Sequence, residues 1–433
     1  MNQDITPDTS SATSSPTTDP DVITSVADFI KTIKKEIPDP FSENRGPKFF
    51  YRGHADESWD LKPSIFRSHK GIENEHLLFR DMVAHEPQDF SQCKSALDYL
   101  VQMQHYGLPT RLLDVTTNPL VALYFACQPA GDTSVSRIVG AAFDAALGVA
   151  FDAATYAENY PEAPPSNSSN DSLEEILSSV GVLAGVLTAA NTKHEENPIG
   201  DRMVSCIVAP LIKEFPDFAE EIRAGVDAGK KAAIEAGPKD GAVYLFSVPE
   251  DRVKHYDSDT VSILSNLAKC GDIEINIHQD EELATKLEQE EDVHMEHEDP
   301  SLLAFNNKDG IQILLHQIRE EKPYFQPLID PFDLCRTFLV KPKYANPRII
   351  NQAGAFFLFG LKLTVGSWGK CLRKGVDKEV PMLPAQWVKK KFIIPKMFKA
   401  DILKELKFLG ITDSYIYSGI EQYAKVLKER YRL

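Results

Sequence analysis

The stretch QHYGLPTRLLDVTTNPLVALYFAC, from Gln104 to Cys127, decides how this chain folds. It places His, Tyr, Arg, Asp and two adjacent Thr directly in front of an apolar segment. Asn118 is a suitable N-cap and Pro119 occupies the favoured first helical position, so a buried helix is expected to begin here. Hydroxyls and free backbone amides in front of a helix form a polar or anion-binding pocket, which is our interpretation of the stretch. The alternative is a capped helix whose threonines serve only as caps.

On both sides of this stretch, segments of helical and of β-type sequence alternate. The spacing of apolar residues predicts helices over residues 21–37, 71–86, 93–107 and 257–270. Runs of aromatic and β-branched residues predict strands within residues 47–56, 240–256 and 333–344, and a strand, a turn and a strand over 346–366. This mixture predicts an α+β fold, with a mixed or antiparallel sheet flanked by helices.

Changes in composition divide the chain into parts. Residues 1–22 are rich in Ser, Thr and Pro, which predicts a disordered leader. An Ala- and Gly-rich stretch predicts a helical insertion over 139–238, which leaves 23–138 and 239–433 as the core with a C-terminal extension. Residues 278–299 predict a solvated acidic loop. The insertion and the acidic loop are candidate surfaces for a protein partner.

The net charge of −17 argues against broad binding to nucleic acid or to an anionic membrane. No run approaches the roughly 20 apolar residues that span a bilayer. The N-terminus lacks the basic and apolar regions of a secretory signal. The 6 Cys are scattered without a CxxC pair, which favours buried thiols in the reducing cytoplasm. Asp257 and Asp259 lie where they either cap a helix or bind a metal, and without Cys or His at ligand spacing we predict no metal site.

Several polar residues have the chemistry of a binding site. In Tyr51-Arg52-Gly53, the Arg offers a planar fork for phosphate or carboxylate and the Gly permits close approach to the backbone. The alternative for this Arg is a structural salt bridge at a strand end. Arg111 and Asp114 either pair with each other or point to opposite sides.

Three further candidates lie at the ends of predicted elements. His105 and Tyr106 end a helix, where polar side chains project beyond the last turn, and a structural histidine is the alternative for His105. Gln352 lies with Arg348 in the predicted strand before Gly354, where a structural hairpin is the alternative.

Taken together, these segments resemble the FRG-domain family, which is named for a Phe/Tyr-Arg-Gly motif, here Tyr51-Arg52-Gly53. The resemblance includes most of the stretch that begins at Gln104, and it extends through WDLKPSIFR, DGAVYLFSV, YDSDTVSILSNLA, EEKPYF, NPRIINQAGAFFLFG and ILKELKFLGI. It covers most of residues 25–433 apart from the predicted insertion.

A second, weaker resemblance is to the arginine-serine-glutamate ADP-ribosyltransferases. The YRG segment is similar to their Arg-bearing first strand, LLDVTTNPLVALYFA to their Ser-Thr-Ser strand and the apolar helix after it, and RIINQAGAFFLFG falls where their third motif lies. The resemblance implies a sheet like theirs and NAD as the cofactor. It implies that Arg52 orients NAD and that Thr116 and Thr117 support its ribose. The full set of residues expected to contact the cofactor is Tyr51, Arg52, Gly53, Tyr106, Arg111, Thr116 and Thr117.

The third motif departs from the family pattern because Arg348 and Gln352 stand where a Glu is expected. A neutral Gln hydrogen-bonds a ribose but does not offset developing positive charge. Either Asp114 or another acid replaces the missing carboxylate, or the site binds a nucleotide without the usual reaction. His105, whose ordinary pKa is about 6.5, is the candidate base toward an acceptor hydroxyl.

Three functions follow from this sequence. The first is an NAD-using ADP-ribosyltransferase-like enzyme that acts as a toxin or phage-defence effector, with His105, Asp114 and Gln352 as its catalytic residues. The second is a non-catalytic nucleotide-sensing or protein-interaction module. The third is a hydrolase or nuclease that uses His105 and Asp114.

Overall fold

The chain divides into two compact units, one formed by Met1–Cys127 with Gly241–Leu433 and the other by Gln128–Asp240. The computed structural model describes some isolated positions and residues 21–37, 46–130, 238–271, 274–277, 299–344, 346–366, 369–373 and 383–417. All described strands and helices belong to the first unit. The predicted insertion over 139–238 lies, apart from its last residue, outside the described residues, as does the predicted leader up to residue 20.

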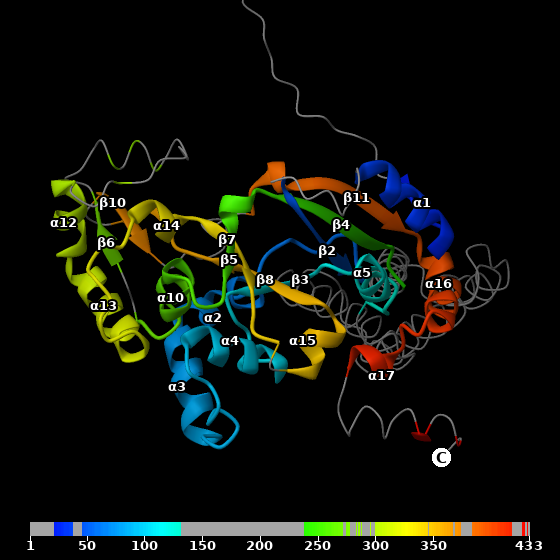
Figure 1. Cartoon of the computed structure of the whole chain (residues 1–433), viewed down its shortest axis with the longest axis horizontal. Helices are drawn as coiled ribbons and strands as arrows, with labels where there is room; N and C mark the ends of the chain where they lie inside the picture. The colour runs from blue at the N-terminus through cyan, green and yellow to red at the C-terminus, as the bar shows by residue number, and fades with distance from the viewer. Residues whose placement is uncertain are drawn as a thin grey trace, which may run out of the picture. The chain divides into compact units, whose positions relative to one another are not determined.

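The first unit contains a large sheet and a small one (Figure 1). The strands of the large sheet are β1 (Asp21–Val22), β2 (Lys48–His54), β3 (Leu112–Thr116), β4 (Gly241–Val248), β5 (Val253–His255), β7 (Thr337–Lys341), β8 (Gly354–Phe359) and β11 (Val388–Ile394). They run in the order β1-β11-β4-β2-β3-β8-β7-β5. The small sheet has the order β6-β10-β9, with β6 at Glu274–Asn276, β9 at Lys362–Gly366 and β10 at Gly369–Arg373.

The large sheet is mixed. β1 pairs with β11, and β5 with β7, in parallel, whereas the other neighbours pair in antiparallel fashion. The predicted α+β fold with a mixed sheet is therefore confirmed. Asp21 and Val22, which the sequence assigned to the leader, already pair with β11.

Helices flank the sheet. Those before β4 are α1 (Val26–Glu36), η1 (Ser64–Arg67), α2 (His69–Glu73), α3 (Glu75–His85), α4 (Ala96–His105) and α5 (Pro119–Ala126). Those after β4 are η3 (Glu250–Arg252), α10 (Asp259–Asn266), α12 (Pro300–Asn306), α13 (Asp309–Glu321), α14 (Pro331–Cys335), α15 (Pro347–Asn351), η5 (Ala385–Trp387), α16 (Lys396–Phe408) and α17 (Asp413–Ile416). In Figure 1, α1 and α16 lie beside each other near β11, and α10, α13 and α14 form a separate group.

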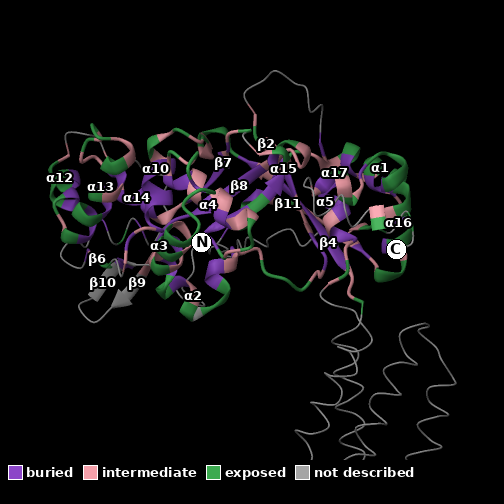
Figure 2. Ribbon diagram, turned by 90° about the horizontal axis from the view of Figure 1, so that it is seen from below, coloured by how far each residue is buried: buried purple, intermediate pink, exposed green. Residues whose placement is uncertain are grey.

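Strands β4, β7 and β8 of the large sheet consist mostly of buried residues (Figure 2). On β4, Tyr244 belongs to one core and Leu245 to another. Because successive strand residues point to opposite faces, these cores lie on opposite sides of the sheet. The core around Leu245 receives apolar residues from α1, α5 and α16, and the core around Tyr244 receives them from η1 and η5. A third core is built from α4, α10, α13 and strands β7 and β8.

The capping signals in the sequence fix several helix ends. Asn118 caps α5 by accepting from Leu120 N at 3.0 Å, with Pro119 at the first position, as predicted. Gly107 follows α4 with a φ of 85°, a left-handed conformation that suits glycine. Ser258 caps α10 by accepting from Val261 N at 3.3 Å. These local interactions explain why helix positions were well predicted from sequence.

The predicted strand over residues 346–353 is wrong, because this segment is helix α15 and the strand β8 begins at Gly354. Asn346 caps the helix by accepting from Arg348 N at 2.8 Å, and Pro347 occupies the first helical position. The same Asn-Pro signal that starts α5 thus outweighs the β propensity of Ile349 and Ile350.

The predicted acidic loop over residues 278–299 is not solvated throughout. Leu283 and Leu287 are 5% and 8% exposed and belong to the third core. Leu283, Thr285 and Leu287 have helical main chain. A spacing of four residues places both leucines on one side of a helix. These two side chains therefore pack into the core although the sequence around them is charged.

Candidate functional site

The three predicted motifs meet on neighbouring strands at the centre of the large sheet. Tyr51 of β2 lies opposite Thr116 of β3, and Thr116 lies opposite Gly354 of β8. The strand that carries Arg52, the strand that ends in hydroxyls and the third motif are therefore side by side.

The sheet is split between β2 and β3. Within these two fully described strands, Tyr51 and Thr116 form the one registered pair, whereas β2 pairs with β4 from Lys48 to His54. Beyond the Tyr51 pair, Arg52 Nη1 donates to the main-chain oxygen of Asp114 at 2.5 Å. At this point a hydrogen bond from the Arg52 guanidinium therefore takes the place of main-chain pairing between the two strands.

Arg52 is half-buried and stays a cation at neutral pH. Burial lowers its pKa to about 10, with Asp114 opposing the shift and Arg67 adding to it. Its Nε donates to His54 Nε2 at 2.8 Å, and in the described part of the chain no hydrogen bond uses its Nη2. Since a guanidinium carries five N–H donors, the donors on Nη2 remain available to an anionic ligand.

His54 is the buried residue that orients Arg52. Its Nε2 accepts the Arg52 hydrogen bond, so the proton of the neutral imidazole resides on Nδ1. Burial lowers the pKa of His54 to about 3, and the charges of Arg52 and Arg67 add to this shift. The rings of Trp59 and Tyr244 lie 6.0 and 5.2 Å from the imidazole. His54 therefore holds the Arg52 guanidinium without neutralising its charge.

Basic and aromatic side chains surround this pair. Arg67, at the end of η1, is exposed and close enough to lower the pKa of Arg52. Trp59 is 41% exposed. Lys391 of β11 lies over the Tyr244 ring at 5.7 Å. We call the following set the Arg52 face: Arg52, His54, Trp59 and Arg67.

The sequence interpretation missed three members of the Arg52 face. The signal for His54 was present, because it follows Arg52 by two residues on one strand and side chains at that spacing share a face. Trp59 and Arg67 lie in irregular and 3₁₀ segments, for which no periodicity predicts a direction.

Gly53 serves the packing of α5 against β2. A Cβ at this position would lie 1.9 Å from the main-chain oxygen of Ala122 and 2.7 Å from the nitrogen of Ala126. The close approach predicted for this glycine therefore exists, and the group that approaches is the α5 backbone. Tyr51, two residues earlier on β2, is buried, and burial raises the pKa of its hydroxyl to about 12.

Asp114 presents its carboxylate on the opposite face of the sheet from the Arg52 side chain. Tyr51 and Thr116 share a face as registered partners, so Arg52 points to the other face. Asp114 precedes Thr116 by two residues and shares its face. It is exposed, and Gln104 Nε2 donates to its Oδ2 at 2.7 Å. Gln104 in turn accepts a hydrogen bond from the Thr110 hydroxyl.

Thr116 and Thr117 connect β3 to the turn between α15 and β8. Thr116 Oγ1 donates to the main-chain oxygen of Gln352 at 2.5 Å and accepts from Asn118 N at 2.9 Å. Thr117 N donates to the Ala353 oxygen at 3.1 Å. Ala353 has a φ of 46°, which is strained for a residue with a Cβ, so these bonds stabilise an unfavourable turn.

The side chains of Gln352 and His105 contact different parts of the structure. Gln352 Nε2 donates to the main-chain oxygen of Ile416 at 3.1 Å. Burial lowers the pKa of His105, and the charge of Arg348 adds to the shift. The ring of the half-exposed Tyr106 lies 5.3 Å from the His105 ring. Among the described residues, no hydrogen bond joins His105 to Asp114.

Arg111 is wholly buried, and its predicted contact with a ligand is wrong. Its Nε donates to Glu75 Oε1 at 2.8 Å, its Nη2 to Glu75 Oε2 at 2.5 Å and its Nη1 to the Phe359 oxygen at 3.0 Å. Arg111 therefore neither pairs with Asp114 nor reaches the surface, because its partner comes from the distant helix α3.

Asp257 and Asp259 lie away from these strands. Asp259 is in the first turn of α10 and pairs with Lys322 at 2.7 Å. In the part of the chain that the structure describes, no group of three His, Cys, Asp or Glu residues could hold a metal ion.

The predicted residues form two groups that are joined at Asp114. Its main-chain oxygen accepts from Arg52, and its carboxylate accepts from Gln104.

No described helix is both long and apolar enough to cross a membrane. No curated protein and no solved structure matches the chain. A family model of the FRG domain matches residues 47–134, which include β2, β3, α5 and the whole Arg52 face. The chain therefore contains an FRG domain over residues 47–134, whose motif arginine lies at the split in the central sheet.

Proposed function

We propose that this FRG domain binds NAD at the split between β2 and β3 and transfers ADP-ribose from it. One observation carries the proposal. Arg52 is a charged guanidinium that a neutral imidazole and a main-chain oxygen hold in place, and the donors on its Nη2 are left over within the described part of the chain. A cation fixed in this way is preorganised for a phosphate, because little side-chain entropy remains to be lost on binding.

The residues around Arg52 suit a dinucleotide. Arg67 supplies a second guanidinium near the first, which matches the two phosphates of NAD. Trp59 offers a partly exposed aromatic surface on which a base or nicotinamide ring stacks. Bound NAD would supply a nicotinamide leaving group and an activated ribose carbon.

Asp114 is the residue that we assign to charge stabilisation. Positive charge develops on the ribose as nicotinamide leaves, and a fixed carboxylate nearby lowers the energy of that state. Asp114 is exposed on the strand next to Arg52, and Gln104 orients its carboxylate. Because this carboxylate lies on the other face of the sheet from the Arg52 side chain, the ribose would have to reach it through the split between β2 and β3. Gln352 does not replace it in this role, because its side chain is neutral and donates to Ile416.

His105 and the two threonines complete the assignment. The lowered pKa of His105 keeps its imidazole neutral at physiological pH, as a base toward an acceptor hydroxyl must be. Thr116 and Thr117 act as positioning residues, because their bonds to Gln352 and Ala353 fix the end of β3.

The test is calorimetric titration of the full chain with NAD, followed by measurement of nicotinamide release. We expect Arg52→Ala to abolish both binding and release. Asp114→Asn should retain binding and slow release by about 100-fold or more. Arg80→Ala is the matched control, since Arg80 is an exposed arginine on α3 whose Nη2 donates to the Lys269 oxygen at 3.3 Å. An absence of binding at millimolar NAD by the folded wild type would overturn the proposal.

One observation favours a second candidate, a nucleotide-sensing module without catalysis. The third motif offers the neutral Gln352 and the cation of Arg348, which lies over the Tyr417 ring at 5.4 Å, in place of a carboxylate. NAD binding that depends on Arg52 but gives no nicotinamide release would establish this candidate. For the enzyme, expression of the wild type should deplete cellular NAD and slow growth, as for a toxin or defence effector, whereas Arg52→Ala should not.

A further inference from the structure

The turn between α15 and β8 is bound both by the end of β3 and by α17. Thr116 Oγ1 donates to the main-chain oxygen of Gln352, and Thr117 N donates to that of Ala353. The turn leads directly into β8, which pairs with every residue of β3. Whatever holds this turn therefore also holds the strand that carries Asp114.

Two side-chain amides join the turn to α17. Asn351 Nδ2 donates to the main-chain oxygen of Tyr415 at 2.8 Å, and Gln352 Nε2 donates to that of Ile416 at 3.1 Å. Main-chain oxygens in the last turn of a helix have no partner within the helix. The two amides therefore satisfy acceptors that α17 itself leaves open.

An aromatic contact and a buried side chain add to these hydrogen bonds. The guanidinium of Arg348 on α15 lies over the Tyr417 ring at 5.4 Å from its centre. Ile416 is wholly buried, in the same core as Val121 and Leu123 of α5. Separation of α17 from the turn would expose the Ile416 side chain to water. α17 is therefore a fixed part of the fold and not a mobile lid.

α17 is also tied to helix α5, which begins directly after the two threonines. The Tyr124 hydroxyl of α5 donates to Asp413 Oδ1 of α17. At the other end of α5, the main-chain nitrogen of its cap, Asn118, donates to Thr116 Oγ1 at 2.9 Å. The end of β3 is thus followed by a helix and hydrogen-bonded to a turn, and both of these are bound to α17.

The turn needs external support because of its backbone conformation. Ala353 has a φ of 46°. A residue with a Cβ adopts this left-handed conformation at a cost, and it persists where surrounding contacts fix it. Without the bonds to α17, Ala353 would relax toward right-handed backbone in part of the molecules. The oxygens that accept from Thr116 and Thr117 would then move.

We propose that Gln352 is a positioning residue, which couples α17 to the end of β3 and so holds Asp114 in its reactive position. The inference rests on the proposed function and deepens it, because it gives Gln352 a role through α17 in place of one on the ribose. NAD affinity should depend little on this coupling, since Arg52 lies on the opposite face of the sheet from Thr116. The rate of nicotinamide release should depend on it.

Hydrogen exchange tests the coupling without NAD. Gln352→Leu removes the donor to α17 and keeps a side chain of similar size. The Thr117 amide, which donates to Ala353, should then exchange about tenfold faster in the full chain, as measured by mass spectrometry of overlapping peptides. Exchange at Thr117 equal to that of the wild type would overturn the proposal.

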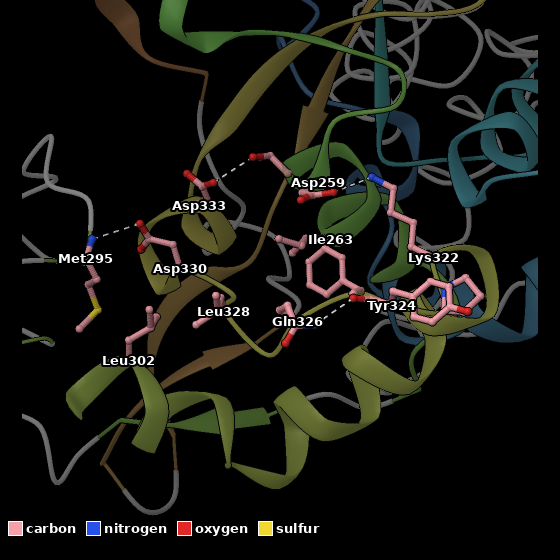
Figure 3. A pocket seen from close by; sticks show the side chains of 13 residues that line it. Asp259, Ile263, Met295, Leu302, Lys322, Tyr324, Gln326, Leu328, Asp330 and Asp333 are labelled. Carbon is pink, nitrogen blue, oxygen red and sulfur yellow. Dashed lines mark hydrogen bonds and ion pairs between the residues drawn. The ribbon is translucent and has the colours of Figure 1, made fainter. Parts of the chain in front are cut away.

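Gln326→Leu is the matched control. Gln326 Nε2 also donates to a main-chain oxygen, that of Tyr324, at 3.3 Å. It lies beside a cavity that residues of α10 and α12 line and that no residue of β3, α15 or α17 lines (Figure 3). This variant should leave the exchange of Thr117 and the release of nicotinamide unchanged.

Kinetics of nicotinamide release separate positioning from a general loss of structure. In Gln352→Leu, kcat should fall about tenfold while KM for NAD stays within about twofold of the wild-type value. A KM that rises as much as kcat falls would refute the positioning role. If the wild type neither binds NAD nor releases nicotinamide, the proposed function fails, whereas exchange at Thr117 still decides whether Gln352 couples α17 to β3.

Gln352→Glu distinguishes this role from a catalytic one. A Glu was expected in this motif, and a carboxylate that stabilised the charged ribose would speed release. A carboxylate beside the Ile416 oxygen cannot donate to it and is repelled by it. We therefore expect Gln352→Glu to slow release and to speed exchange at Thr117 at least as much as Gln352→Leu does. Release faster than in the wild type would overturn the assignment.

Discussion

Two arginines of the FRG domain, Arg52 and Arg111, lie near neighbouring strands and have opposite surroundings. Arg111 is fully buried and bound by both oxygens of Glu75 and by a main-chain oxygen. Arg52 is half-buried and bound by the neutral imidazole of His54 and by the Asp114 oxygen. At Arg111 the protein supplies a carboxylate that neutralises the charge. At Arg52 it supplies neutral acceptors that orient the guanidinium.

This difference separates an arginine whose charge the protein neutralises from one whose charge stays open to a ligand. A buried guanidinium needs a carboxylate, because an unpaired charge in a low dielectric is costly. Arg52 tolerates neutral partners because it retains access to water, and burial then appears as a pKa lowered to about 10. An anionic ligand at Arg52 would supply the charge that Glu75 supplies at Arg111.

The largest effect is expected for Arg111→Met. Removal of Arg111 leaves the buried Glu75 carboxylate without the guanidinium that binds both of its oxygens, which should lower the free energy of unfolding by about 3–5 kcal/mol. The measurement is urea unfolding followed by tryptophan fluorescence, since Trp59 and Trp387 belong to the first unit. Arg111→Met combined with Glu75→Leu should recover part of the loss. If the free energy of unfolding of Arg111→Met lay within about 1 kcal/mol of the wild-type value, that result would contradict a structural role for Arg111.

A smaller effect is expected from protons at His54. Its folded pKa of about 3 lies below the ordinary value of 6.5, so between these values the unfolded chain binds a proton that the folded chain excludes. Stability is therefore complete above pH 6.5 and falls as the pH decreases. From pH 7 to pH 5 the wild type should lose about 2 kcal/mol more than His54→Gln, which keeps an acceptor for Arg52 but does not titrate. Equal losses of unfolding free energy from pH 7 to pH 5 in the two proteins would show that His54 is not a buried neutral group.

The smallest effect on stability is expected for Arg52→Met, about 1 kcal/mol at pH 7 by the same urea experiment. Its hydrogen bonds are to neutral groups, and the loss of two such bonds is partly offset by relief from burying a charge. The contrast with Arg111→Met sharpens the comparison, since Arg52 should matter more for binding than for folding. A loss as large as that of Arg111→Met would place Arg52 among the structural arginines.

Much of the fold follows from local signals in the sequence. Asn118 and Pro119 predicted the start of α5, and Gly107 predicted the end of α4, because caps act between residues a few positions apart. Residues 346–353 carry the same Asn-Pro signal, but the strand prediction rested on the β propensity of Ile349 and Ile350 and was wrong. The candidate site followed in part, as the motif strands were expected to meet.

The directions of the polar side chains did not follow from the sequence. Arg111 appeared equivalent to Arg52 in type and setting, but its partner Glu75 lies on another helix. His54 was overlooked although it shares a strand with Arg52. Asp259 was considered as a helix cap, and the structure places it beside a cavity with Lys322.

The sequence by itself determined the α+β class, the helix caps and the FRG motif, because caps, periodicity and short motifs depend on residues close together in the chain. Only the tertiary structure decided that β2 and β3 separate at Arg52 and that Glu75 neutralises Arg111. Charge and solvent access at a site depend on which remote segments pack around it, and local sequence carries little information about that packing.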